Sequence, residues 1–156
     1  MLTYEEAKVT ILAHARAQEL EKVDFRNAVG RALAEDLVAL EDQPPFDNSA
    51  VDGYAVKLKE IAKATEENPV VLRCQEYIFA GRLDTISLQE GECVQVATGA
   101  PLPQGTEAVV MREQVVRKED QVYFSHPTKR GNNLRRRGRD MSIGDPLFRV
   151  GTTIAP

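Results

Sequence analysis

The feature that most limits how this chain can fold is a series of short, valine-rich segments that begins after residue 52. Glycine, proline or charged residues separate each segment from the next, and the segments are residues 54–56, 70–72, 94–96, 108–111 and 121–124. Such runs are too short for amphipathic helices, whose apolar positions recur over several turns. Short strands at close spacing, with turn residues between them, predict a compact β-rich lobe.

Local signals add detail to this lobe. Residues 118–120 are charged and lie between two valine-containing segments, which predicts a hairpin turn. Residues 58–65 predict a single helix within the lobe, and residues 146–150 predict a final strand near the end of the chain.

The N-terminal segment predicts a helix, which we assign to residues 1–19. Thr3 followed by Glu6 is the pattern of a capping box, in which each side chain binds the backbone N–H of the other residue. Apolar residues follow at helical spacing, although the stripe is thin and rich in alanine. Because isolated short helices are marginal in water, we expect this helix to dock on another surface.

The next part of the chain gives weaker signals. Residues 23–25 alternate and predict a short strand, and residues 27–30 predict a turn or a single helical turn. In residues 31–40 alanine and leucine favour a helix, but the apolar residues fit no clean period, and we favour a strand that ends near Leu40. The pair Pro44-Pro45 enforces extended geometry and marks a boundary between two lobes. One helix followed by many short strands predicts an α+β fold that is predominantly β.

Composition excludes several classes of partner. The chain has 20 basic and 24 acidic residues, a net charge of −4, which disfavours a general nucleic-acid or membrane-surface binder. It has no Trp and no apolar run near the ~18 residues of a membrane span. Cys74 and Cys93 lack metal-site spacing, and we favour two reduced, buried thiols over one disulfide. Without a signal peptide, these features predict a cytoplasmic protein with no nucleic-acid or membrane partner.

Residues 45–55 hold two carboxylates, an amide and a hydroxyl among small residues. Gly53 leaves space beside Asp52 for a ligand or for a second backbone. Taken alone, this cluster is better explained by ordinary turn chemistry, because these side chains bind their own backbone. Its position just before an apolar strand keeps the binding-site interpretation open.

Two further segments carry polar groups that suit an anion. Thr98, with the backbone N–H groups after it, could form an anion-binding nest, or the segment is only a strand exit stiffened by prolines. Residues 129–140 place six cations beside one acid, inside an acidic protein. Guanidinium groups match phosphate oxygens in pairs, and the glycines that bracket this run favour a shaped oxyanion site over a solvated face.

These motifs, in this order, resemble the N-terminal half of molybdopterin molybdotransferases, the MoeA-type bacterial proteins and the E domain of gephyrin. The resemblance covers essentially the whole chain, and its longest and most specific block is residues 45–55. The matching segments are residues 30–36, 45–55, 98–101, 107–110 and 133–138.

The resemblance implies a β-rich lobe inserted into a small, incomplete mixed lobe, with an N-terminal helix. Residues 39–139 would form the β-rich lobe, and residues 20–38 with 140–156 would form part of a central dimerisation lobe. The helix in residues 1–19 would pack on a pterin-binding domain. We expect that domain and a small C-terminal β domain to lie outside these 156 residues.

The implied activity is that of a transferase of molybdenum cofactor biosynthesis. The family inserts molybdate into adenylylated molybdopterin and releases AMP, with Mg²⁺ as cofactor. The complete protein would be a homodimer with a molybdopterin-adenylylating partner, and its cleft would lie between the β-rich lobe of one subunit and the pterin-binding domain of the other. We expect the present chain to be inactive alone.

The resemblance also assigns residues. Asp52, Thr98 and Asp140 match the catalytic polar positions of the cleft, and Asp52 is the candidate Mg²⁺ ligand. The positions matching the surrounding cofactor-binding motif are Ser49, Arg135, Arg136 and Arg137. The sequence departs from the family pattern at Arg139, where an acid is usual, and at Val51, where methionine is common.

Two other interpretations compete with this one. A non-catalytic anion-binding or protein-docking module would use the same arginines without any chemistry. A small RNA-binding β module is disfavoured by the net acidity and by the scarcity of aromatic residues.

Overall fold

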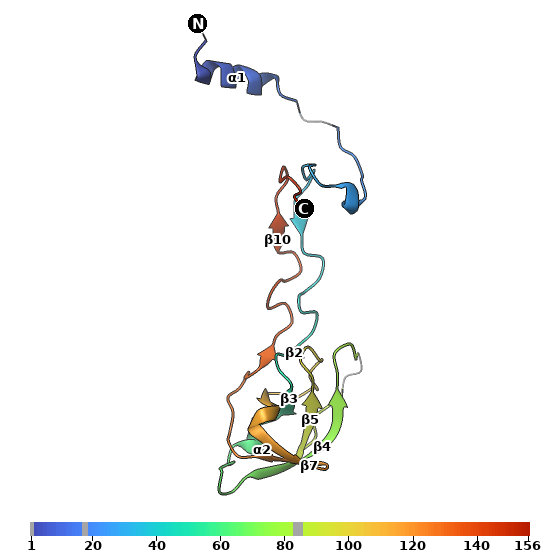
Figure 1. Ribbon diagram of the computed structural model, residues 1–156, viewed down its shortest axis with the longest axis vertical. Coiled ribbons are helices and arrows are strands. Elements are labelled where there is room, and N and C mark those ends of the chain that lie inside the picture. The colour runs from blue at the N-terminus through green and yellow to red at the C-terminus, as the bar shows by residue number, and fades with distance from the viewer. Residues whose placement is uncertain (1, 17–18, 83–85) are drawn as a thin grey trace. The chain divides into compact units, whose positions relative to one another are not determined.

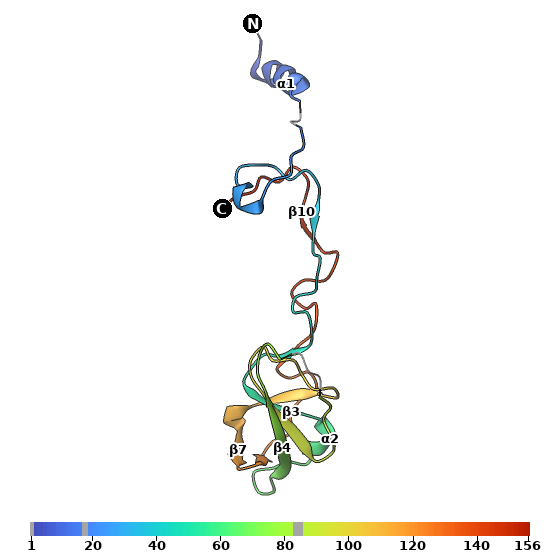
Figure 2. The same ribbon diagram turned by 90° about the vertical axis from the view of Figure 1, so that its right-hand side faces the viewer.

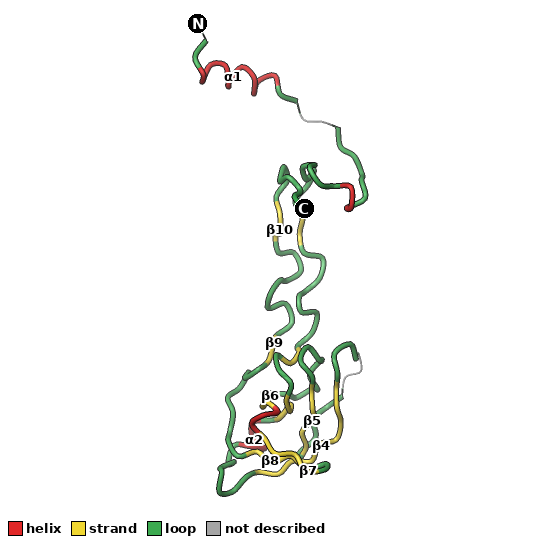
Figure 3. Tube along the Cα trace, in the orientation of Figure 1, coloured by secondary structure: helices red, strands yellow, loops and turns green. Residues whose placement is uncertain are grey.

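The computed structural model describes residues 2–16, 19–82 and 86–156. The chain forms two compact units, Met1–Leu37 with Pro146–Pro156, and Val38–Asp145. Strands predominate and gather in the second unit, while the first contains the N-terminal helix (Figures 1 and 3). The predicted fold class, α+β and predominantly β with an N-terminal helix, is confirmed.

Helix α1 (Tyr4–His14) opens the first unit with the predicted capping box. Thr3 N–H donates to Glu6 Oε2 at 2.8 Å, and Glu6 N–H donates to Thr3 Oγ1 at 3.3 Å. The helix ends at His14, short of the predicted residue 19, and residues 1, 17 and 18 lie outside the described residues. No residue of α1 is buried, so its apolar side chains are not covered by the described residues of this unit.

The strand predicted at residues 23–25 is wrong. Phe25–Asn27 form the 3₁₀ helix η1, because the Asp24 carboxylate accepts the backbone N–H of Arg26 and the Asp24 carbonyl accepts that of Asn27. These bonds close a tight turn where alternation alone indicated an extended segment. The turn predicted to follow is present and ends at Gly30, whose φ is +83°.

The strand predicted for residues 31–40 is present only as β1 (Leu37–Val38), which pairs with β10 (Pro146–Phe148). The ladder is interrupted because the Asp36 side chain accepts the Val150 N–H at 2.7 Å. The predicted final strand is therefore confirmed in its first three residues. Beyond it, irregular backbone bonds and one bridge, Ala32 with Thr153, hold residues 30–33 to residues 151–154.

The second unit is built on a curled six-stranded sheet (Figure 2). Its strands follow the order β6-β3-β5-β4-β8-β7. Neighbouring strands are antiparallel, except that β4 and β5 are parallel. All five predicted strand segments are confirmed, and Glu119, with φ of +55°, forms the predicted hairpin turn. The strands are β3 (Gly53–Val56), β4 (Val70–Ile78), β5 (Glu92–Val96), β6 (Ala108–Met111), β7 (Val115–Lys118) and β8 (Gln121–Phe124).

Shorter elements complete this unit: β2 (Asn48–Ser49), α2 (Leu58–Ile61), η2 (Arg112–Gln114) and β9 (Leu134–Arg135). Helix α2 is shorter than the predicted 58–65: it ends at Ile61, whose carbonyl accepts the Ala64 N–H at 3.1 Å in a closing turn, and Thr65 and Asn68 bind each other in a separate turn that follows. Its first N–H, that of Leu58, is bound by the Glu107 carboxylate at 2.8 Å.

Strand β3 lies at the centre of the core, and all four of its residues are buried. Tyr54 and Val56 pack into one apolar cluster with Phe124, and Ala55 packs into a second cluster with Val109. The rings of Tyr54 and Phe124 meet edge to face, with centroids 6.4 Å apart. The loop that enters β3 is therefore anchored to a fully buried strand.

Candidate functional site

The three polar segments identified in the sequence meet around β2 (Figure 1). Ser49 N–H donates to the Ala100 carbonyl at 3.0 Å, and Gly99 N–H donates to the Ser49 carbonyl at 2.8 Å. On its other side, β2 pairs with β9, with Asn48 opposite Arg135. The backbone of the 45–55 segment thus links the Thr98 loop to the arginine loop.

Asp52 and Thr98 are joined by two hydrogen bonds. Asp52 Oδ1 accepts the backbone N–H of Thr98 at 2.8 Å and its hydroxyl at 2.9 Å. These two donors, with a smaller contribution from the Arg112 guanidinium, lower the pKa of Asp52 below its ordinary value. Among the described residues, no group donates a hydrogen bond to Asp52 Oδ2. The site therefore presents an ionised carboxylate with one oxygen available.

Gly53 explains how Asp52 is held. A Cβ at this position would lie 2.2 Å from the Val110 carbonyl oxygen and 2.9 Å from Val109 Cγ1. Of the two roles that the sequence left open, the glycine serves the approach of a second backbone, that of β6. The Asp52 carbonyl also accepts the Arg112 N–H at 3.0 Å, which fixes the residue between β3 and η2.

In the arginine loop, three consecutive arginines pair with three different aspartates. Arg135 pairs with Asp140, Arg136 with Asp47, and Arg137 with Asp42. Arg130 pairs with Glu107 at 2.6 Å. Within the described part of the chain, Lys129 and Arg139 make no ion pair.

The electrostatics of these pairs stabilise ionised carboxylates. Burial raises the pKa of Asp47, but the Arg137 N–H and the Arg136 guanidinium outweigh it, so the pKa is lowered. The pKa of Asp42 is lowered by the Ile143 N–H and then by Arg137. An incoming anion would therefore compete with carboxylates of the same chain for these guanidinium groups.

Ser49 and Asn48 are the buried polar residues of the region. Ser49 is 1% exposed, and its hydroxyl donates to the Val51 carbonyl at 2.6 Å, within its own loop. Asn48 is 7% exposed, and its Oδ1 has no hydrogen-bond partner among the described residues. Asn48 is the amide of the 45–55 motif, whereas no sequence pattern singles out Asp42 or Arg112, because their contacts depend on residues far along the chain.

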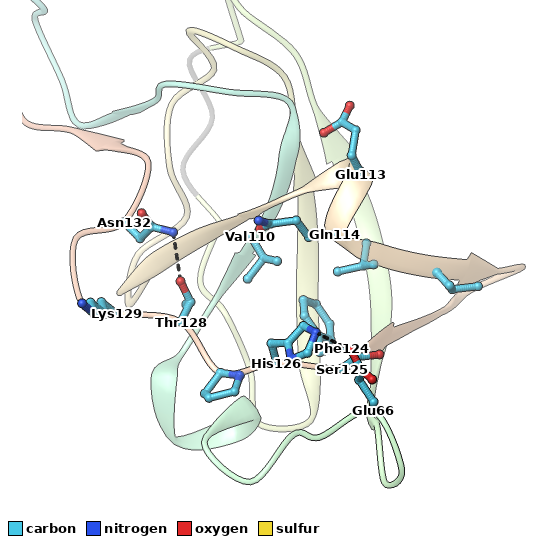
Figure 4. Close-up of a pocket in the computed structure, with 13 residues that line it drawn as sticks. Glu66, Val110, Glu113, Gln114, Phe124, Ser125, His126, Thr128, Lys129 and Asn132 are labelled. Atoms are coloured by element: carbon cyan, nitrogen blue, oxygen red, sulfur yellow. Dashed lines mark hydrogen bonds and ion pairs between the residues drawn. The ribbon is translucent and has the colours of Figure 1, made fainter.

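A separate pocket of about 780 Å³ lies between β6, η2, β7 and the segment that follows β8 (Figure 4). Val110 and Phe124 contribute apolar lining, and His126 Nε2 lies 3.4 Å from Glu66 Oε1 at its rim. None of the predicted site residues lines it. The predicted site is thus a polar surface around β2 rather than this pocket.

Metal ligands do not gather within the described residues: no three His, Cys, Asp or Glu side chains lie together as a metal-binding group. Cys74 and Cys93 are free and buried, as predicted. In the part of the chain that the structure describes, no helix has both the length and the apolar character of a membrane span.

The comparisons with known proteins all point to the same family. Residues 2–156 match the family described as the MoeA N-terminal region (domain I and II). Molybdopterin molybdenumtransferase 2 of Mycobacterium tuberculosis is 35% identical over 156 residues, which are 100% of this chain and 38% of the relative. The molybdopterin molybdenumtransferase of Haemophilus influenzae is 34% identical over 158 residues, again 100% of this chain and 38% of the relative.

A crystal structure of the molybdopterin biosynthesis moeA protein from Pyrococcus horikoshii OT3 superposes with a TM-score of 0.80 at 41% identity, covering 87% of this chain and 36% of that protein. A second structure of the Pyrococcus protein gives a TM-score of 0.86 at 31% identity, covering 97% and 39%. The chain therefore spans less than half the length of the relatives it matches.

Proposed function

The chain belongs to the family of the MoeA N-terminal region, and from this premise we propose that it is the N-terminal part of a molybdopterin molybdenumtransferase. The complete enzyme inserts molybdate into adenylylated molybdopterin and releases AMP. The observation that carries the proposal is the Asp52–Thr98 pair, in which two segments 46 residues apart hold an ionised carboxylate with one free oxygen.

We assign the catalytic roles to Asp52, Thr98 and Asp140. Asp52 remains charged at neutral pH, and Thr98 holds it in one orientation through two donors. Asp140 is paired with Arg135, so the position of its carboxylate depends on that guanidinium. Substrate binding near Arg135 would therefore also reorient Asp140.

We assign binding of the anionic substrate to Arg135, Arg136 and Arg137. Each guanidinium already holds a carboxylate, and phosphate or molybdate oxygens offer the same kind of acceptor. Ser49 supports the binding loop through its buried hydroxyl.

The residues present can contribute to a Mg²⁺ site but do not complete one. Mg²⁺ is commonly held by one or two carboxylates together with waters and substrate phosphates. Asp52 Oδ2 supplies one such ligand, and the described residues form no group of three. When bound, the ion would neutralise charge on the substrate phosphates.

We further propose that the complete protein is a cytoplasmic homodimer that receives its substrate from a molybdopterin-adenylylating partner. Residues 39–139 correspond to its β-rich lobe, residues 20–38 and 140–156 to part of the dimerisation lobe, and residues 1–19 to a helix that docks on the pterin-binding domain. The exposed apolar side chains of α1 support such docking, since Val9, Ile11 and Leu12 are 62–70% exposed.

The test is Asp52→Asn in a complete transferase that carries this chain. The substitution keeps the shape and removes the charge, so we expect AMP release to fall by about 100-fold or more, with little change in Tm. Asp120→Asn, in the β7–β8 turn, is the matched control and should leave both quantities unchanged. A normal rate in a normally folded Asp52→Asn enzyme would refute the assigned role.

A further inference from the structure

The two cysteines face each other across the parallel pair of strands in the sheet. Cys74 in β4 and Cys93 in β5 are register partners, and both belong to the same apolar cluster, so their side chains lie on one face. Register partners on neighbouring strands lie about 4.8 Å apart. This separation falls within the range of about 4.4–6.8 Å between Cα atoms that a disulfide spans.

The backbone beside Cys74 is irregular. The β4–β5 register shifts between Cys74 and Tyr77, so the ladder does not continue regularly past the cysteine. The protonated Cys74 thiol can donate to the Glu76 carbonyl, 3.7 Å from its sulfur. The irregularity is confined to the β5 side of β4, because on the other side the Cys74 N–H donates to the Asp120 carbonyl at 2.6 Å.

The surroundings make the two sulfurs chemically different. A hydrogen bond from the Cys93 thiol lowers the pKa of Cys74; burial opposes this, and the Gln95 N–H and the Arg117 guanidinium add to it. The same hydrogen bond, together with burial, raises the pKa of Cys93. Cys74 is therefore the better thiolate and, at 6% exposure against 0% for Cys93, the more accessible of the two, while Cys93 is the thiol that stays protonated beside it.

We propose that Cys74 and Cys93 form a reversible redox pair that a hydroperoxide converts into an intrachain disulfide. The Cys74 thiolate attacks the peroxide, the O–O bond breaks, and hydroxide or an alkoxide leaves, so that Cys74 becomes a sulfenic acid. The Cys93 sulfur then attacks the Cys74 sulfur, the S–O bond breaks and water leaves. Two electrons pass from the two thiols to the peroxide, and an external dithiol returns them.

The disulfide would join β4 to β5, the strand that leads into the Thr98 loop. Val96 is the last residue of β5, two residues before Thr98. The modification would thus fix the register of the strand that positions one of the donors to Asp52. Neither cysteine contributes to the polar surface around β2, so this redox site is distinct from the proposed catalytic one.

The experiment treats the reduced, folded chain with hydrogen peroxide at neutral pH. We expect the thiol count to fall from two to zero, and the mass of the intact chain to fall by that of two hydrogens. Trypsin cleaves after Arg73 and Arg82 and should release the peptide of residues 74–82 joined to the peptide that contains Cys93. A dithiol reductant should restore both thiols.

Two variants identify the order of the steps. In Cys93→Ser the reaction should stop at the Cys74 sulfenic acid, which dimedone traps, and in Cys74→Ser the peroxide should leave Cys93 unmodified. If a serine variant fails to fold, the alanine variant replaces it, and the linked peptide of the unaltered chain needs no variant. Any of three results would overturn the proposal: both thiols survive the treatment, the disulfides form between chains, or Cys93 in Cys74→Ser is oxidised as readily as in the unaltered chain.

Discussion

Replacing Gly53 with alanine tests whether the close contact between β3 and β6 positions the Asp52 loop. The new Cβ would lie 2.2 Å from the Val110 carbonyl oxygen, whereas Cβ contacts below 3.0 Å essentially never occur. The two backbones must therefore separate by at least about 0.8 Å, which is enough to break the hydrogen bonds at this end of the pair.

The expected cost follows from these contacts. Overpacking of a tight site costs about 1–3 kcal/mol, and each lost backbone hydrogen bond adds about 1 kcal/mol. We expect Gly53→Ala to lower the free energy of unfolding by about 3 kcal/mol and Tm by about 10 °C. Urea denaturation and thermal melting, both followed by circular dichroism, measure these two quantities.

Gly91→Ala is the matched control. Gly91 has φ of +73°, and a Cβ added there would have no atom within 4 Å, so alanine meets only backbone strain. That strain costs about 1–2 kcal/mol. If Gly53→Ala is no more destabilising than Gly91→Ala, the close approach of β6 does not explain the glycine, and the reasoning fails.

Three more predictions concern the ionised groups and the activity of the chain. Thr98→Val removes the hydroxyl donor and keeps the N–H donor, so the pKa of Asp52 should rise toward its ordinary value of 3.8; an NMR titration that shows no change contradicts the assignment. Stability should fall as the pH drops below about 4, because the pKa values of Asp42 and Asp47 are lower in the folded than in the unfolded chain. The stability that these two carboxylates contribute is complete above the unfolded pKa and is lost as the pH falls through the folded pKa. The urea midpoint of the variant with both aspartates changed to asparagine should therefore depend less on pH. The isolated chain should release no AMP from adenylylated molybdopterin and molybdate, which chromatography of the nucleotide products measures.

Local interactions were predictable from the sequence. The capping box of Thr3 and Glu6 spans three residues, and the hairpin at residues 118–120 needs only its two flanking strands. The prediction of a strand at residues 23–25 is wrong, and the reason is equally local. The Asp24 side chain binds the backbone two residues on, and this competes with the extended conformation that alternation indicates.

Sheet order was not predictable in the same way. The valine-rich segments located five strands but carried no indication that β4 and β5 are parallel, which places Cys74 opposite Cys93. Parallel pairing depends on how the chain returns between the two strands, and strand composition carries no record of that path.

For the candidate site, the order of residues reveals which chemical groups are available: carboxylates in residues 45–55, a hydroxyl at Thr98 and a run of arginines. Their pairing emerges only in the folded chain. Asp52 meets Thr98 across 46 residues, and Arg136 meets Asp47 across 89. Gly53 shows the same division, since its lack of a side chain is visible in the sequence but the backbone that fills the space belongs to β6. The physical reason is that donors, acceptors and missing side chains are properties of single residues, whereas distances between them arise only when the core brings distant strands together.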